Sequence, residues 1–196
     1  MMGVSKTLNL CLVFIMKGEF DMAGNLTDYR ASSVGAEETL FFLEVPTSMT
    51  APDTKAYHMA FLRQEASSID TGVETETIAD VTQKTQPTEV KSYSPTQEFS
   101  GLFLKTDPVC IYLQHLYDTR AVGGKAHCNH LEVRKWAEGG NVAFKSDVTV
   151  SISSITNEAG NQRMISGTFG FAGDPEEGTA TIADETGIAT YTKKSE

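Results

Sequence analysis

The feature that most constrains this chain is a succession of short β-rich segments from Glu37 onward, punctuated by Gly, Pro and Asp. Segments of this kind, in which Val, Ile, Phe, Tyr and Thr alternate with polar residues, are typical of strands. We expect strands at 38–45, 56–62, 73–81, 88–105 with a break at Pro95, 126–136, 146–155, 163–171, 178–183 and 187–192. The last two would form a hairpin across residues 184–186. The sequence therefore predicts a mainly β fold, a β-sandwich or barrel.

One segment, 106–120, has a helical pattern instead. Asp107 can cap the helix and Pro108 suits its first turn, while Gly123 and Gly124 end the region. The apolar residues recur at helical spacing and are expected to pack against a sheet: Val109, Tyr112, Leu113, Leu116 and Tyr117. The expected architecture is thus a β-sandwich or barrel with one flanking α-helix.

Length and charge narrow the function classes. The 196 residues are enough for one domain with a substantial core, and three cysteines suggest no disulfide framework. The formal net charge is −10. An acidic surface of this kind disfavours adhesion to nucleic acid or to an anionic membrane, although it could guide DNA by repelling it.

The first residues allow three interpretations. Leu8–Met16 is a short apolar run that resembles a signal peptide, but no small-residue cleavage site follows it. Lys17-Gly18-Glu19 can be encoded by a purine-rich ribosome-binding sequence, and Met22 follows after a short spacer. We expect 1–21 to be a translated leader, with Met22 rather than Met1 as the true start. A signal or anchor and a structural arm are the alternatives.

The segment 126–132, AHCNHLE, holds three potential metal ligands and a carboxylate. On a strand, His127 and Asn129 would point to one face and Cys128 and His130 to the other. Zinc normally needs at least three protein ligands, so two per face are too few. A nucleophilic pair of Cys128 and His130 also lacks an orienting third group. We expect no metal site and no catalytic residue here.

Other motifs are no stronger. Gly123-Gly124-Lys125 lacks the spacing of a phosphate-binding loop, and no nucleophile elbow is present. Asp174 with Glu176 and Glu177 could be read as calcium ligands, but a turn set by Gly173 and Pro175 explains that stretch better. The sequence predicts a protein that is not an enzyme and needs no cofactor.

The order of the pieces resembles a family. An extended SYSPTQEFSGLF is followed by a helix opened by TDPV, then by FKSDVTVSISS and ISGTFGFAGDPEEGTATI. This arrangement, over about 85–191, resembles the major tail proteins of long-tailed, siphovirus-type phages, whose ending is similar to FGFAGDPEEGT. The resemblance implies that 22–196 is one tail-tube domain. It also implies rings of six copies stacked into a tube, in which each subunit contributes strands to an inner barrel.

The resemblance further implies a virion protein that is assembled in the host cytoplasm and lies in the finished tail. Its partners would be copies of itself, a tape measure protein, and tail terminator or baseplate proteins, with DNA passing through and no membrane involved. Six chains of −10 give a ring of −60. A bore lined by carboxylates and hydroxyls would offer DNA phosphates no partner.

Two polar strand faces are candidates for the bore surface, and the sequence does not rank them. They are Glu74, Glu76 and Asp80, or Asp147, Thr149 and Ser151. Segments 46–55 and 63–72 are expected to be loops that become ordered on assembly.

Alternative functions are the tube of a contractile injection system, a secreted β-sandwich adhesin or carbohydrate-binding module, and a metal-dependent hydrolase. Rings would favour the tail protein, a cleaved leader the secreted module and bound zinc the hydrolase.

Overall fold

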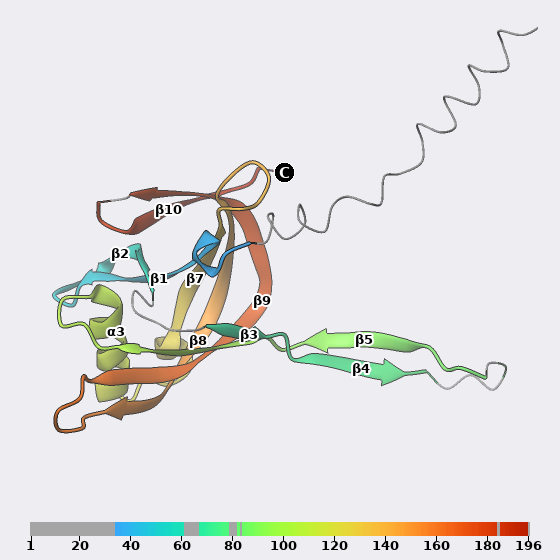
Figure 1. Cartoon of the computed structure of the whole chain (residues 1–196), viewed down its shortest axis with the longest axis horizontal. Helices are drawn as coiled ribbons and strands as arrows, with labels where there is room; N and C mark the ends of the chain where they lie inside the picture. Colours follow the sequence, from blue (N-terminus) through green and yellow to red (C-terminus); the bar gives the residue numbers. More distant parts are fainter. Residues whose placement is uncertain (1–33, 61–66, 79–81, 83, 184, 196) are drawn as a thin grey trace, which may run out of the picture. The chain divides into compact units, whose positions relative to one another are not determined.

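A computed structural model describes residues 34–60, 67–78, 82, 84–183 and 185–195. From Ala36 onward these residues belong to one compact unit. Its elements are η1 (Ala36–Glu38), β1 (Thr39–Ser48), β2 (Ala51–Met59), β3 (Ser68–Asp70), β4 (Val73–Thr77), β5 (Thr88–Tyr93), β6 (Thr96–Leu102), α3 (Pro108–Asp118), η2 (Gly123–Ala126), β7 (His127–Arg134), β8 (Val142–Thr156), β9 (Met164–Ala183) and β10 (Ile188–Lys193). The predicted mainly β fold with one α-helix is confirmed for the described part of the chain (Figure 1).

Most strands form one antiparallel sheet that closes on itself. Its order is β10-β2-β1-β7-β8-β9-β6-β3, and β10 also pairs with β9. Strands β10, β2, β1, β7, β8 and the second half of β9 therefore make a closed barrel, while β6 and β3 continue the sheet from the first half of β9. Closure removes two free strand edges from the subunit.

The sheet separates two hydrophobic cores. Adjacent residues Phe42 and Leu43 of β1 point to opposite faces of the sheet, and both are fully buried. Both faces of the sheet are therefore packed at this position. Phe42 joins the core inside the barrel, with Leu131, Val133, Ala143, Ala180 and Ala189. Leu43 joins the core under α3, with Val148, Val150, Phe99 and Phe169 among others. We call these two surfaces of the sheet the barrel face and the helix face.

Helix α3 covers the helix face. It begins as predicted, since the Asp107 carboxylate accepts a hydrogen bond from the Val109 N–H at 3.0 Å and Pro108 is the first helical residue. Val109, Leu113 and Leu116 are buried, and Tyr112 packs against the same core. Tyr117 is 37% exposed, and its ring lies under the Arg120 guanidinium at 4.3 Å.

Two loop predictions are wrong. The turn expected at Gly173 and Pro175 lies inside the 20-residue strand β9. Between the pairs Asp147↔Ala172 and Lys145↔Glu176, β9 has more residues than β8, so the turn-forming residues make a bulge, with Gly173 at φ +71°. Segment 46–55 is also largely strand, because β1 and β2 pair as far as Ser48↔Ala51.

Some predictions fall on residues outside the described ranges. These are the leader and the choice between Met1 and Met22, residues 79–81 of the expected strand end 78–81, and residues 63–66 of the expected loop 63–72. In the described part of that loop, Ser68–Asp70 form strand β3 by pairing with β6, so the loop prediction is wrong there. Among the described helices, none has the length and apolar character needed to cross a membrane.

Candidate functional site

Strands β3 to β6 form one long hairpin that leaves the sheet halfway. The register of β3 with β6, ending at Asp70↔Thr96, continues without a shift into that of β4 with β5 at Val73↔Tyr93. The distal pair β4–β5 is a separate two-stranded sheet, which we call the arm. Figure 1 shows it extending away from the other strands.

The base of the arm is held by a specific backbone geometry. Gly72 has φ +54°, its N–H donates to the Asp70 carboxylate at 3.0 Å, and its carbonyl accepts from the Ser94 N–H at 3.1 Å. A Cβ on Gly72 would lie 2.3 Å from the Ser94 carbonyl oxygen, so only glycine fits. On the other strand, Pro95 has no N–H to donate to a neighbouring strand. It therefore suits the position between β5 and β6, where the pairing of one sheet ends and that of the other begins.

The barrel face becomes polar where it leaves the closed barrel. Asp147, Thr149 and Ser151 of β8 lie on it, opposite the buried Val148 and Val150. Cross-strand neighbours extend this surface through β7, β9 and β6: His127 and Asn129, Thr168 and Gly170, Thr96 and Glu98. We call this surface the polar face, and no helix of the described chain packs on it.

Hydrogen bonds order the polar face. The His127 ring lies between Asp147, with Nδ1 3.2 Å from a carboxylate oxygen, and the Thr149 hydroxyl, 3.1 Å from Nε2. The Ser166 hydroxyl lies 3.1 Å from that of Ser154. The surface thus presents carboxylates and hydroxyls together with the His127 imidazole and the Asn129 amide, and hydrogen bonds between neighbouring strands hold several of these groups in place.

The two candidate sets for a bore surface lie in two different sheets. Asp147, Thr149 and Ser151 lie on the polar face, whereas Glu74 and Glu76 share one side of β4 in the arm. The Ser92 hydroxyl donates to Glu74 at 3.1 Å across the arm, so Ser92 lies on that same side. Asp80 lies outside the described residues.

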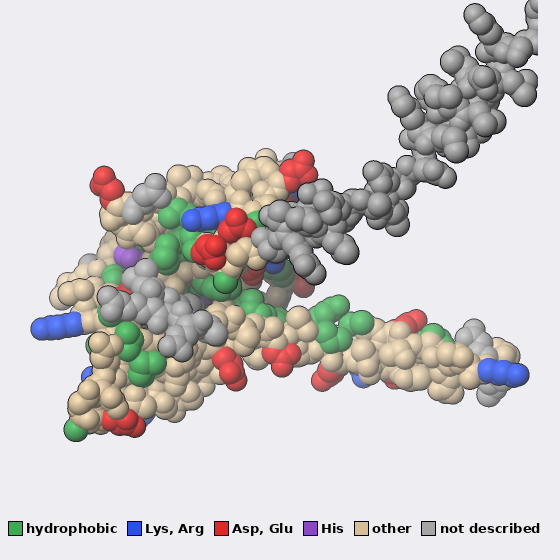
Figure 2. Space-filling view, in the orientation of Figure 1, with side chains coloured by type: hydrophobic (Ala, Val, Ile, Leu, Met, Phe, Trp, Pro, Cys, Tyr) green, Lys and Arg blue, Asp and Glu red, His purple; other side chains and the backbone are tan. Residues whose placement is uncertain are grey.

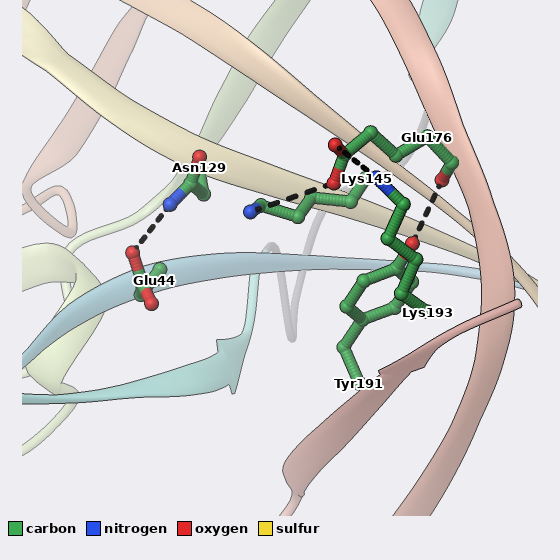
Figure 3. Close-up of polar contacts among 6 residues, drawn as sticks. All are labelled: Glu44, Asn129, Lys145, Glu176, Tyr191 and Lys193. Atoms are coloured by element: carbon green, nitrogen blue, oxygen red, sulfur yellow. Dashed lines mark hydrogen bonds and ion pairs between the residues drawn. The ribbon is translucent and has the colours of Figure 1, made fainter. Parts of the chain in front are cut away.

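A second polar cluster fills the end of the barrel next to the polar face (Figure 3). The Asn129 amide donates to the Glu44 carboxylate at 2.6 Å. The Glu176 carboxylate lies 2.9 Å from Lys193 Nζ and 3.8 Å from Lys145 Nζ. Hydrogen bonding to Lys193 and its charge lower the pKa of Glu176. Because each charge has a partner, this cluster is a structural closure of the barrel.

All of the segment AHCNHLE except Ala126, which ends η2, lies in β7 and alternates as predicted. Cys128 and His130 are buried on the helix face, while His127 and Asn129 lie on the polar face. Burial raises the pKa of the Cys128 thiol to about 12, which opposes formation of a nucleophilic thiolate. Burial lowers the pKa of His130 to about 3. Within the described ranges, no three His, Cys, Asp or Glu side chains gather as metal ligands would.

Sequence reasoning missed the arm and the exposed apolar residues on it. Figure 2 shows apolar side chains at the surface where the arm leaves the body and acidic ones along it. The available signal was the presence of Gly72 and Pro95 at the base of the hairpin, where Gly72 pairs with Ser94, the residue before Pro95. The polarity of the residues in a strand does not indicate whether that strand pairs within the large sheet or lies in a separate hairpin.

Comparison with known proteins identifies the fold. No family model and no curated protein matches the sequence. One solved structure, the tail of an empty GTA particle with C6 symmetry, matches with a TM-score of 0.52 and 11% identity, over 73% of this chain and 97% of that chain. The SPP1 tail tube matches with a TM-score of 0.56 and 11% identity, over 75% and 80%. The predicted likeness to tail-tube proteins is confirmed for the fold.

Proposed function

We propose that this chain is the tube-forming subunit of a non-contractile phage tail. Copies join side by side into rings, the rings stack, and DNA passes through the bore during ejection. The fold likeness supports this, as does the C6 symmetry of one of the structures that share the fold. In the proposed ring six chains assemble, and the sheet portion β8-β9-β6-β3 forms part of an inner barrel that neighbouring subunits complete.

The observation that carries the proposal is the uncovered polar face. An antiparallel sheet in a small domain commonly has one face packed on the core and the other face exposed to solvent. Here one side is packed under α3, and the other presents Asp147, Glu98 and a row of hydroxyls. Carboxylates and hydroxyls offer no cation to phosphate, so DNA lying against this surface would slide rather than bind.

The subunit itself performs no chemistry in this proposal. Its partners are its own copies, and a tape measure protein and tail terminator or baseplate proteins are expected at the inside and ends of the tube. No cofactor is required. The protein functions in the tail of the virion after assembly in the host cytoplasm.

The test is a charge reversal on the polar face. Asp147→Lys would place six new cations in each ring, so we expect tubes to form normally while DNA ejection slows by about tenfold or more. Glu138→Lys, in an exposed loop after β7, makes the same charge change away from the polar face and is the control.

Ejection can be followed by the release of dye-labelled DNA from particles carrying either variant. Equal ejection rates for Asp147→Lys and Glu138→Lys would show that the polar face does not line the bore. Absence of tubes in the unmodified protein would refute the function as a whole.

A further inference from the structure

One side chain of the polar face can change its charge near neutral pH. The chain has four histidines, and His127 is the one on this face. His58 pairs with Leu43 and so lies on the helix face, as does His130, whereas His115 is exposed on α3. Histidine ordinarily gains or loses a proton between about pH 5 and 8. His127 is therefore the group through which the charge of the polar face responds to pH in that range.

The position of His127 suits both of its protonation states. Its Nδ1 lies 3.2 Å from the Asp147 carboxylate, and its Nε2 lies 3.1 Å from the Thr149 hydroxyl. In the neutral ring Nδ1–H donates to the carboxylate, and Nε2 accepts the hydroxyl proton. In the charged ring both nitrogens donate, and the hydroxyl rotates to accept. The ring thus gains a charge without any change in the positions of the strands.

Asp147 is the charged group in contact with His127. The two side chains are 49% and 38% exposed, so both exchange protons with solvent. Strand β9 adds no charge at this position, because its residues opposite this part of β8 are Ala172 and Gly170. The other charged side chains nearby lie on β1, on β2 and in η2: Glu44, Lys55 and Lys125. The charge of a protonated His127 is therefore set against that of Asp147.

We propose that His127 makes the passage of DNA through the bore dependent on pH. In mildly basic solution the neutral ring leaves the Asp147 charge on the polar face, and phosphate is repelled. In mildly acidic solution the imidazolium cancels that charge, once in every copy around the ring. The proposal rests on the proposed function, because it requires the polar face to line the bore.

Protonation acts on DNA in two ways that have the same direction. It removes the repulsion between Asp147 and phosphate, and it supplies a cation that can replace a counterion of the DNA. DNA in a stack of rings meets this change in every ring, so small contributions add along the tube. DNA is expected to move more slowly in acid, and high salt should reduce the difference by screening.

The test is DNA ejection at pH 8.0 and pH 5.5 from particles that carry the unmodified chain, His127→Gln or His115→Gln. Glutamine keeps a polar side chain that forms hydrogen bonds but does not titrate. We expect the unmodified particles to eject DNA at least about threefold more slowly at pH 5.5 than at pH 8.0, and His127→Gln should remove this difference. His115→Gln removes an exposed histidine from α3, away from the polar face, and should retain the difference.

Equal rates at the two pH values in the unmodified particles would overturn the proposal. So would a pH dependence that is the same in His127→Gln as in the unmodified particles, since it would come from another group. Circular dichroism at pH 5.5 checks that the variants remain folded, and His127→Asn is a second replacement that does not titrate.

Asp147→Lys distinguishes this failure from a failure of the proposed function. If it ejects DNA at the same rate as Glu138→Lys at pH 8.0, the polar face does not line the bore, and the proposed function fails. If Asp147→Lys is slowed but the unmodified particles show no pH dependence, the assignment of the bore stands and the role of His127 fails.

Nuclear magnetic resonance of the ring nitrogens gives a readout that is independent of ejection. The His127 signals, assigned by their absence from His127→Gln, should show the uptake of a proton between pH 8.0 and pH 5.5. A ring that keeps one protonation state across this range would overturn the proposal.

Discussion

At the scale of single residues, His130 is the most unusual side chain. It is 1% exposed, lies among Phe41, Phe169 and Phe171 at ring distances of 5.6, 6.0 and 5.3 Å, and neither ring nitrogen has a hydrogen-bond partner within the described chain. A group in this position can only be neutral in the folded state. Its pKa, lowered by burial to about 3, makes folding sensitive to acid.

Proton binding determines whether acid stabilises or destabilises the fold. In the unfolded state His130 has the ordinary histidine pKa of 6.5 and takes up a proton below it, whereas the folded state does so only near pH 3. The free energy of unfolding therefore loses about 1.4 kcal/mol per pH unit between these values through His130 alone, with no loss above pH 6.5.

We expect His130→Phe to remove this dependence. Urea unfolding at pH 7, 5.5 and 4.5 should show a stability difference between variant and wild type that grows in favour of the variant as pH falls. His130→Leu provides a second apolar replacement if Phe overpacks the site. A difference that is constant with pH would show that His130 does not titrate in this way.

At the scale of elements, α3 acts as the cover of the helix face. Leu113 is 2% exposed and Ile111, two residues earlier, is 36% exposed. We expect Leu113→Ala to reduce the free energy of unfolding by about 2–5 kcal/mol. Ile111→Ala should cost less than about 1 kcal/mol, since little apolar area is buried there. Similar losses in thermal or urea unfolding would mean that the helix does not pack through this stripe.

The arm should be separable from the body. Because Gly72 and Ser94 already pair at 3.1 Å, residues 73–93 can be replaced by a two-residue turn. We expect the shortened chain to keep its unfolding midpoint within a few degrees, because β4 and β5 pair only with each other. A collapse of the midpoint would show that the arm supports the fold of the body.

The elements also show how far sequence reasoning reached. Helix α3 was predictable because its cap and its apolar stripe are local signals. The bulge in β9 was not, because Gly173 and Pro175 suit a turn and only pairing with β8 keeps the chain extended. The polar side of β8 was predictable from its alternation, but the position of Glu74 in a separate two-stranded sheet depends on the pairing of β4 with β5. In the sequence, His130 could be read as a metal ligand. Its burial was not predictable, because it depends on three Phe side chains, two of which come from a strand far along the sequence.

At the scale of the whole molecule, charge opposes assembly. Chains of −10 repel one another, and salt screens that repulsion with a Debye length of about 8 Å at 0.15 M ionic strength. We expect tube formation, followed by sedimentation, to increase from 20 mM to 300 mM NaCl. Assembly that declines with salt in the unmodified protein would indicate that attraction dominates.

The account depends most on self-assembly into a hollow tube with the polar face inward. Electron microscopy of the concentrated, purified full chain tests this directly. The account predicts stacked rings with six-fold symmetry, with Asp147, Thr149 and Ser151 on the bore. Protein that stays monomeric at every concentration and salt, or tubes whose bore is lined by another surface, would contradict it.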